Sequence, residues 1–189
     1  MRPEGYESIA EHYVHARRPG IGPRTVLQWA KALPPGASIL DLGCGHGIPI
    51  SEALLQVGHK VYGVDASPTL VSKFRERFPE VPVECSMVED SPFFSRTFDA
   101  AVAWGLMFLL TPETQRSLIG KVARALDRHG RFLFTSPKQT CTWADSLTGL
   151  PSVSLGHEAY EQELAAHGLA LVGNDEDEGE NYYYFAARS

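Results

Sequence analysis

The sequence has few cysteines, no long apolar run and no excess of positive charge, and each absence excludes a class of protein. Its three cysteines, Cys44, Cys85 and Cys141, are widely spaced and form no C-x-x-C pair, which argues against a disulfide framework or a zinc site and suits a reducing compartment. No apolar run approaches the ~20 residues that a membrane-spanning helix needs. The first residues are mixed and polar, without the apolar core of a signal peptide. We therefore expect a cytoplasmic protein with no bound metal and no membrane partner.

The charge balance argues against a nucleic-acid partner. Lys and Arg number 17 against 23 Asp and Glu, and the formal net charge is −6. Proteins that bind a phosphate backbone usually carry a basic stripe, which this composition does not favour. The chain has no internal repeat, and its 189 residues, 43% of them hydrophobic, suit one compact core. We expect a single domain that is a monomer or a homodimer.

Short apolar runs alternate with amphipathic stretches along the chain, which predicts an α/β fold. Strands separated by helices of this length form right-handed βαβ crossovers, so we expect a doubly wound, mostly parallel, seven-stranded sheet with helices on both faces. The last two strands are joined by a turn without a helix, which predicts that they pair antiparallel at the sheet edge, with the last strand antiparallel to the rest. The expected strands are 38–42, 60–65, 81–85, 98–105, 130–136, 169–173 and 181–187, and the expected helices are 6–17, 22–33, 48–58, 68–78, 111–126 and 157–168.

A glycine-rich turn, "DLGCGHG", follows the first expected strand. Gly43, Gly45 and Gly47 carry no Cβ, so the chain can reverse sharply there and a ligand can approach the backbone. The next strand ends in Asp65, where a carboxylate can accept both hydroxyls of a ribose. In a sheet of this kind the ligand lies beyond the carboxyl ends of the strands, beside the first of them.

Two features of this turn argue against a dinucleotide ligand. The spacing is G-x-G-x-G rather than G-x-G-x-x-G, and Asp41 stands two residues before the first glycine. A carboxylate there is a poor neighbour for a pyrophosphate but a good one for an ammonium group. S-adenosylmethionine carries a ribose, an adenine and an ammonium, and it has no phosphate.

The stretches "LDLGCGHG" and "VYGVDASP" closely resemble the cofactor-binding motifs of the class I, Rossmann-like, S-adenosylmethionine-dependent methyltransferases, in particular small-molecule domains of type 11 or 25. The resemblance covers roughly residues 35–137. It implies methyl transfer from S-adenosylmethionine to a small organic acceptor, with S-adenosylhomocysteine as the product. It also implies a division into a helical lid (1–34), a cofactor-binding core (35–137), an acceptor-side loop (138–156) and a C-terminal helix with an edge hairpin (157–189).

The resemblance assigns cofactor-binding roles position by position. The position that often carries an aspartate for the adenine amino group falls in Ser86-Met87-Val88 here, so we expect Met87 to pack on the ring instead. No histidine follows the fourth strand, where the chain has Phe108-Leu109-Leu110. The expected cofactor contacts are Asp41 and the backbone of Gly43, Cys44, Gly45 and Gly47 at the methionine end, Asp65 at the ribose, Ala66, Leu70, Met87 and Val88 at the adenine, the backbone of Ala103 and Trp104 at the end of the fourth strand, and Tyr13 and Arg18 from the lid.

The acceptor site is expected in the long irregular stretch 137–156, because such connections often carry function. Trp143 and Phe108 are candidates for its aromatic wall, and Asp145 is a candidate anchor or catalytic base. Tyr183, near the end of the chain, is a second catalytic candidate if it points inward. The sequence leaves two other classes open: a nucleotide-dependent oxidoreductase, and a regulator that binds S-adenosylmethionine without turning over an acceptor.

Overall fold

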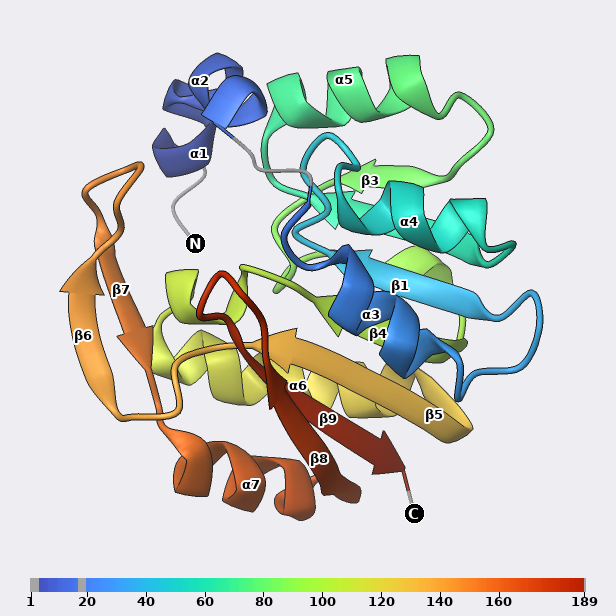
Figure 1. The fold of residues 1–189 in the computed structure, drawn as a ribbon, viewed down its shortest axis with the longest axis vertical. Coiled ribbons are helices and arrows are strands. Elements are labelled where there is room, and N and C mark those ends of the chain that lie inside the picture. Colours follow the sequence, from blue (N-terminus) through green and yellow to red (C-terminus); the bar gives the residue numbers. More distant parts are fainter. Residues whose placement is uncertain (1–3, 17–19, 189) are drawn as a thin grey trace.

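The computed structural model describes residues 4–16 and 20–188, and they form one seven-stranded sheet flanked by helices (Figure 1). The strands are β1 Ser38–Leu42, β2 Lys60–Asp65, β3 Val83–Cys85, β4 Phe98–Ala103, β5 Leu126–Thr135, β6 Cys141–Ala144, β7 Pro151–Ser154, β8 Leu169–Glu176 and β9 Tyr182–Arg188. The helices are α1 Glu4–Ser8, α2 Ala10–Ala16, α3 Pro23–Ala30, α4 Ile50–Gln56, α5 Pro68–Arg77, α6 Pro112–Ala125 and α7 His157–Ala166, with short 3₁₀ turns η1 Phe93–Ser95 and η2 Met107–Leu109.

The order of strands in the sheet is β3-β2-β1-β4-β5-β9-β8. The first five of these strands run parallel, and β9 is antiparallel to both of its neighbours, β5 and β8. The expected seven-stranded, mostly parallel sheet with an antiparallel last strand is therefore confirmed. Because β9 runs antiparallel to β8, the turn between β8 and β9 lies at the same end of the sheet as the carboxyl ends of the parallel strands.

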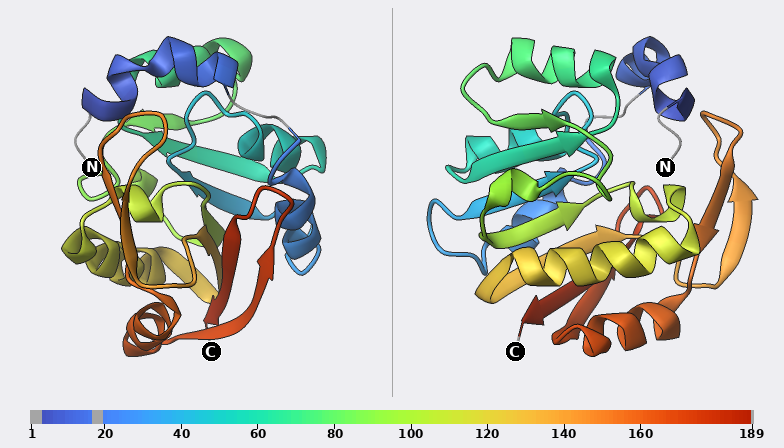
Figure 2. Two further views of the ribbon diagram at one scale, coloured as in Figure 1. Left: turned by 60° about the vertical axis from the view of Figure 1, so that its left-hand side comes forward. Right: turned by 180° about the vertical axis from the view of Figure 1, so that it is seen from behind.

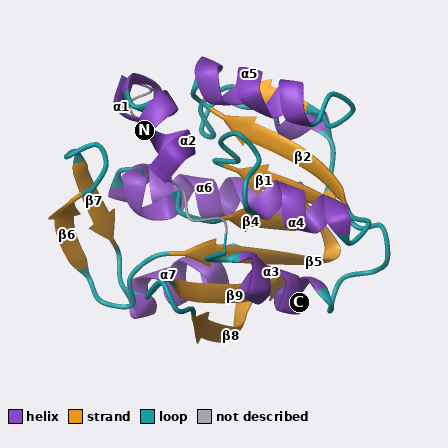
Figure 3. Ribbon diagram, turned by 45° about the horizontal axis from the view of Figure 1, so that its top comes forward, coloured by secondary structure: helices purple, strands orange, loops and turns teal. Residues whose placement is uncertain are grey.

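Helices cover both faces of the sheet, as Figures 2 and 3 show. On one face, Val26 of α3 and Leu54 of α4 pack with Ile39 of β1. On the other, Leu118 of α6 and Tyr160 of α7 belong to a second apolar cluster with the inner strands. The apolar faces that the sequence periodicity predicts are the faces that these helices bury. Among the described residues, no helix is long and apolar enough to cross a membrane.

The stretch 137–156 is not irregular throughout, and that expectation was wrong. It contains the antiparallel hairpin β6–β7, which stands apart from the main sheet (Figure 1). Its turn is closed by Asp145, whose carboxylate accepts hydrogen bonds from the backbone N–H groups of Leu147 and Thr148 and from the Thr148 hydroxyl. Each strand has four residues and only weak alternation, so the periodicity signal was too short to detect.

The N-terminal region also differs from the single lid that was expected over residues 1–34. The predicted helix 6–17 is divided at Ile9 into α1 and α2, which lie beside α5 (Figure 1). By contrast, α3 buries Val26 and Trp29 against the sheet and belongs to the core layer. Among the described residues, α1 and α2 are the helices of this region that lie beside α5. We call these two helices the lid, and their role as a lid stays a prediction.

Candidate active site

The glycine turn after β1 folds tightly against the end of β2. Gly43 and Cys44 donate their backbone N–H groups to the carbonyl oxygen of Val64, at 2.8 Å and 3.2 Å. Gly43, Gly45 and Gly47 have φ values of 70°, 55° and 88°, a region that favours glycine. The turn can therefore take this shape only because these three positions lack side chains.

Asp65, at the end of β2, is the carboxylate that meets this turn. Its Oδ2 accepts the Gly45 N–H at 2.8 Å, and its Oδ1 accepts the Ser67 N–H at 2.9 Å. The carboxylate is 7% exposed, and burial raises its pKa, although these two hydrogen bonds act in the opposite direction. Each oxygen has a second lone pair, so Asp65 can hold the turn and still accept a ligand hydroxyl.

A narrow cavity of about 30 Å³ lies between the turn, the start of α5 and the lid helices. It gathers residues from four separate segments of the chain, at the carboxyl ends of β1, β2 and β4. Those that the sequence predicted are Tyr13, Gly43, Gly45, Asp65, Ala66, Leu70 and Trp104, and those that it missed are Tyr6, Ser67, Gly105, Leu106 and Leu109. Gly105 and Leu106 directly follow the predicted Trp104, so a wider window after the fourth strand would have found them.

Other residues expected at the cofactor do not line this cavity. Asp41 is buried, and its Oδ2 accepts the hydroxyl of Ser51 in α4 at 2.5 Å. Gly47 packs against Phe78, with no room for a side chain. Met87, Val88 and Ala103 also lie outside the lining, and Arg18 lies outside the described residues. Their cofactor contacts stay predictions.

Cys44 lies inside the turn with its sulfur against Gly63 of β2, where an added Cβ would come within 2.7 Å of it. Burial, together with the charges of Asp65 and Asp41, raises the pKa of this thiol well above its ordinary value. A thiol that stays protonated is a weak nucleophile. The position suits a small space-filling residue whose backbone belongs to the turn.

The lid is fastened to α5 through a carboxylate. Glu7 of α1 accepts hydrogen bonds from the Ser67 hydroxyl, from the Thr69 hydroxyl at 2.6 Å and from the Thr69 N–H at 3.2 Å. These bonds to Ser67 and Thr69 lower the pKa of Glu7. A second link is the ion pair of Glu11 with Lys73, at 3.0 Å. Both links join the lid to the helix that begins beside Asp65.

A second, wider cavity of about 660 Å³ lies between η2, the hairpin β6–β7 and the turn between β8 and β9. It brings together the three residues that the sequence proposed for the acceptor: Phe108, Trp143 and Asp145. The rings of Phe108 and Trp143 are 5.5 Å apart, centre to centre. Its polar members Lys138 and Gln139 lie in the predicted stretch 137–156, although they were not singled out. The sequence missed Glu176, Glu180, Asn181 and Tyr182, which the pairing of β8 with β9 brings here.

The two catalytic candidates are both engaged in hydrogen bonds inside the protein. Asp145 Oδ1 accepts the three bonds that close the β6–β7 turn. Tyr183 points inward and is fully buried, but it does not line the wide cavity. Its hydroxyl donates to Asp177 and accepts from Trp104, and burial with the nearby Asp177 raises the pKa of Tyr183 far above its ordinary value. A catalytic role for either residue stays a prediction.

The sheet order and the cavity beside β1 and β2 define a Rossmann-like α/β protein. The fold matches the crystal structure of 1,6-didemethyltoxoflavin-N1-methyltransferase from Burkholderia thailandensis, with a TM-score of 0.75 over 97% of this chain and 84% of that one, at 19% identity. That structure contains bound 1,6-didemethyltoxoflavin and S-adenosylhomocysteine.

At the level of sequence, residues 39–130 match the family described as "methyltransferase domain". An uncharacterized methyltransferase of Synechocystis is 31% identical over 112 residues, which is 59% of this chain and 52% of that protein. Aklanonic acid methyltransferase of a Streptomyces strain is 31% identical over 110 residues, 54% of this chain and 49% of that protein. Residues 39–130, just under half of the chain, therefore resemble a methyltransferase domain in sequence, and the fold resembles that of a methyltransferase whose structure holds S-adenosylhomocysteine. The chain spans about half the length of these two curated relatives.

Proposed function

We propose that this chain transfers a methyl group from S-adenosylmethionine to a small organic acceptor and releases S-adenosylhomocysteine. The observation that carries the proposal is that two cavities lie next to each other at the carboxyl ends of the parallel strands. The narrow one holds the glycine turn and Asp65, and the wide one holds the aromatic pair. They share a wall, where the Gly105 N–H donates to the Thr135 hydroxyl at 2.8 Å.

The residues of the narrow cavity fit the cofactor by the chemistry of their donors and acceptors. Asp65 would accept the ribose hydroxyls, and the turn offers backbone close to the ligand without side chains in the way. Ala66 and Leu70 would lie along the adenine, and Tyr13 would cover it from α2. Asp41, with its charge buried below the turn, would favour the ammonium end through space.

Entry of a ligand of this size requires part of the cavity wall to move. Its volume of about 30 Å³ holds little more than a water molecule or two. Tyr6 and Tyr13 form the wall on the lid side, and their rings meet edge to face at 5.3 Å. We propose that α1 and α2 swing away from α5 to admit the cofactor, because Glu7 and Glu11 hold them through side chains and not through the sheet.

The acceptor would lie in the wide cavity with its nucleophilic atom towards the shared wall. When bound, S-adenosylmethionine would supply an electrophilic methyl group, which the acceptor's lone pair would take as the sulfur–carbon bond breaks and its electron pair returns to sulfur; a proton on the acceptor atom would be released to the solvent of the open wide cavity. Positioning and exclusion of water can supply much of the acceleration of such an in-line displacement. Phe108 and Trp143 would hold an apolar or aromatic acceptor.

A small molecule is the acceptor class that we favour. The formal net charge of −6 disfavours nucleic acid. Two similar proteins, named for aklanonic acid and for 1,6-didemethyltoxoflavin, also point to small organic acceptors. We further propose that the protein works in the cytoplasm, as a monomer or a homodimer, with residues 35–137 as its cofactor-binding part.

Calorimetric titration with S-adenosylmethionine, S-adenosylhomocysteine and NADH in parallel tests the proposal. Micromolar binding of the first two without NADH is the expected result. Binding of NADH alone would favour the nucleotide-dependent oxidoreductase instead. A screen of small phenols, amines and thiols with labelled methyl groups then separates an enzyme, which labels an acceptor, from a regulator, which binds the cofactor and labels none.

A further inference from the structure

A chain of buried hydrogen bonds joins the turn between β8 and β9 to the wall of the narrow cavity. Trp104 Nε1 donates to the Tyr183 hydroxyl at 2.7 Å, and that hydroxyl donates to Asp177 Oδ2 at 2.6 Å. All three side chains are less than 10% exposed. The three residues come from the end of β4, from β9 and from the turn, so only the fold brings them together.

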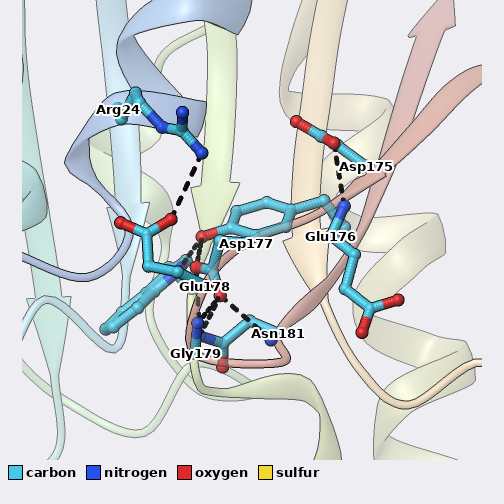
Figure 4. Close-up of polar contacts among 9 residues, drawn as sticks. Arg24, Asp175, Glu176, Asp177, Glu178, Gly179 and Asn181 are labelled. Atoms are coloured by element: carbon cyan, nitrogen blue, oxygen red, sulfur yellow. Dashed lines mark hydrogen bonds and ion pairs between the residues drawn. The ribbon is translucent and has the colours of Figure 1, made fainter.

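Asp177 organises the turn itself, as Figure 4 shows. Its Oδ1 accepts the backbone N–H groups of Gly179 at 2.9 Å and Asn181 at 3.0 Å, together with the Asn181 side-chain amide at 2.9 Å. Oδ1 therefore holds the turn, while Oδ2 holds Tyr183 and also accepts the Asn181 side-chain amide at 3.1 Å. Because a carboxylate accepts at both oxygens, a single residue can do both.

The same turn contributes to the wide cavity. Glu176, Gly179, Glu180 and Asn181 all line it. At the other end of the chain of bonds, Trp104 lines the narrow cavity. Asp177 thus stands between a wall of one cavity and a wall of the other.

The Trp104 ring packs on Gly22, where an added Cβ would come within 2.7 Å of the indole. Its Nε1 is a donor only, and the Tyr183 hydroxyl is the acceptor that the structure gives this N–H. Removing the hydroxyl takes away that buried hydrogen bond, which costs more at a buried site than in water. The hydroxyl therefore helps to fix the orientation of the ring, and Asp177 helps to fix the hydroxyl.

We propose that Asp177 is a positioning residue that acts through Tyr183 to hold the Trp104 ring in the cofactor cavity, and so ties the acceptor-side turn to cofactor binding. The part that concerns the cofactor rests on the function proposed above. Asp177 itself lines neither cavity, and both of its carboxylate oxygens accept hydrogen bonds inside the protein.

The test compares three single variants. Tyr183→Phe removes the hydroxyl and keeps the ring. Asp177→Asn keeps an oxygen for the turn but presents an amide donor to Tyr183, so the tyrosine proton loses its acceptor. Glu178→Gln is the matched control, because Glu178 lies in the same turn, is 54% exposed and pairs with Arg24 at 3.3 Å (Figure 4).

Two measurements report on the chain of hydrogen bonds from Asp177 to Trp104. The first is the indole N–H resonance of Trp104 in the ligand-free protein, assigned among the three tryptophans with a Trp104→Phe variant. The second is the Kd for S-adenosylhomocysteine. We expect Asp177→Asn to shift the Trp104 resonance although it does not touch Trp104, and both Asp177→Asn and Tyr183→Phe to raise the Kd about fivefold or more, equivalent to about 1 kcal/mol.

The double variant should be no weaker in binding than the weaker single variant, since both changes break the same chain of bonds. Four results would each overturn the proposal. They are an unchanged Trp104 resonance in Asp177→Asn, a wild-type Kd in Tyr183→Phe, additive losses of binding in the double variant, and effects of Glu178→Gln as large as those of Asp177→Asn. If Asp177→Asn does not fold, the Kd of Tyr183→Phe decides alone. A wild-type protein that binds no S-adenosylhomocysteine would instead overturn the proposed function, and the resonance would still decide whether the link exists.

Discussion

The two cavities share an edge of the sheet but are built in opposite ways. The narrow one takes its polar groups from one turn and the end of the next strand, Gly43 to Asp65, with much of the work done by backbone. The wide one takes side chains from η2, from the hairpin β6–β7 and from the β8–β9 turn. The contact between the glycine turn and Asp65 is therefore made by two neighbouring strand ends, whereas the rest of both cavities depends on how distant segments pack.

The largest expected loss of stability comes from adding one methyl group to the glycine turn after β1. Gly47→Ala should lower the free energy of unfolding by about 2–4 kcal/mol, because its φ is 88° and its Cβ would come within 2.5 Å of Phe78. Gly58→Ala is the matched control: its φ is 90°, but nothing lies near its Cβ. It should cost about 1 kcal/mol. Urea unfolding measures both, and equal losses would show that the contact with Phe78 does not matter.

Asp65→Ala should weaken binding of S-adenosylhomocysteine by about 1–3 kcal/mol, since two ribose hydroxyls lose their charged acceptor. Asp99 is the matched control, because it also accepts two hydrogen bonds, from the N–H and hydroxyl of Ser38, away from either cavity. Asp99→Ala should leave the Kd unchanged. Calorimetry checks both, and an unchanged Kd in Asp65→Ala would remove Asp65 from the cofactor site.

Trp143→Ala tests the role of the wide cavity. It should leave cofactor binding within about twofold and lower methyl transfer about tenfold, as expected for the loss of one aromatic wall. Thr142→Ala, the exposed neighbour on the opposite side of β6, should change neither. Transfer of labelled methyl to an acceptor from the screen measures the rate. Loss of cofactor binding in Trp143→Ala would instead assign Trp143 to the lid or the core.

The smallest expected effect concerns the lid. The hydrogen bonds that Glu7 accepts lower its pKa. The contribution of Glu7 to holding α1 against α5 is therefore fully present above the ordinary glutamate pKa, and it is lost as the pH falls through the lowered pKa. The Thr69 amide resonance, whose N–H Glu7 accepts, should titrate with a midpoint below the ordinary range and should stop titrating in Glu7→Gln. Glu11→Gln should leave it unchanged. A midpoint at or above the ordinary value would contradict the docking.

The sheet could be predicted because its strands and helices each have a clear period and are joined by short turns. The glycine turn and Asp65 could be predicted because their chemistry lies in two short stretches. The split at Ile9 and the hairpin β6–β7 could not, since both depend on packing that outweighs weak local preferences. The bond between Trp104 and Tyr183 joins residues 79 positions apart, and no pattern in the sequence connects them.

The reversed direction of β9 has a consequence for how such a protein could change its substrate range. It places a short turn over the catalytic edge, where an insertion would lengthen the acceptor wall while leaving the sheet intact. The same turn contains Asp177, so a graft that displaced this residue would also disturb the cofactor side. An insertion at this position should therefore leave Asp177, Gly179 and Asn181 in contact with one another, so that both oxygens of Asp177 keep their partners.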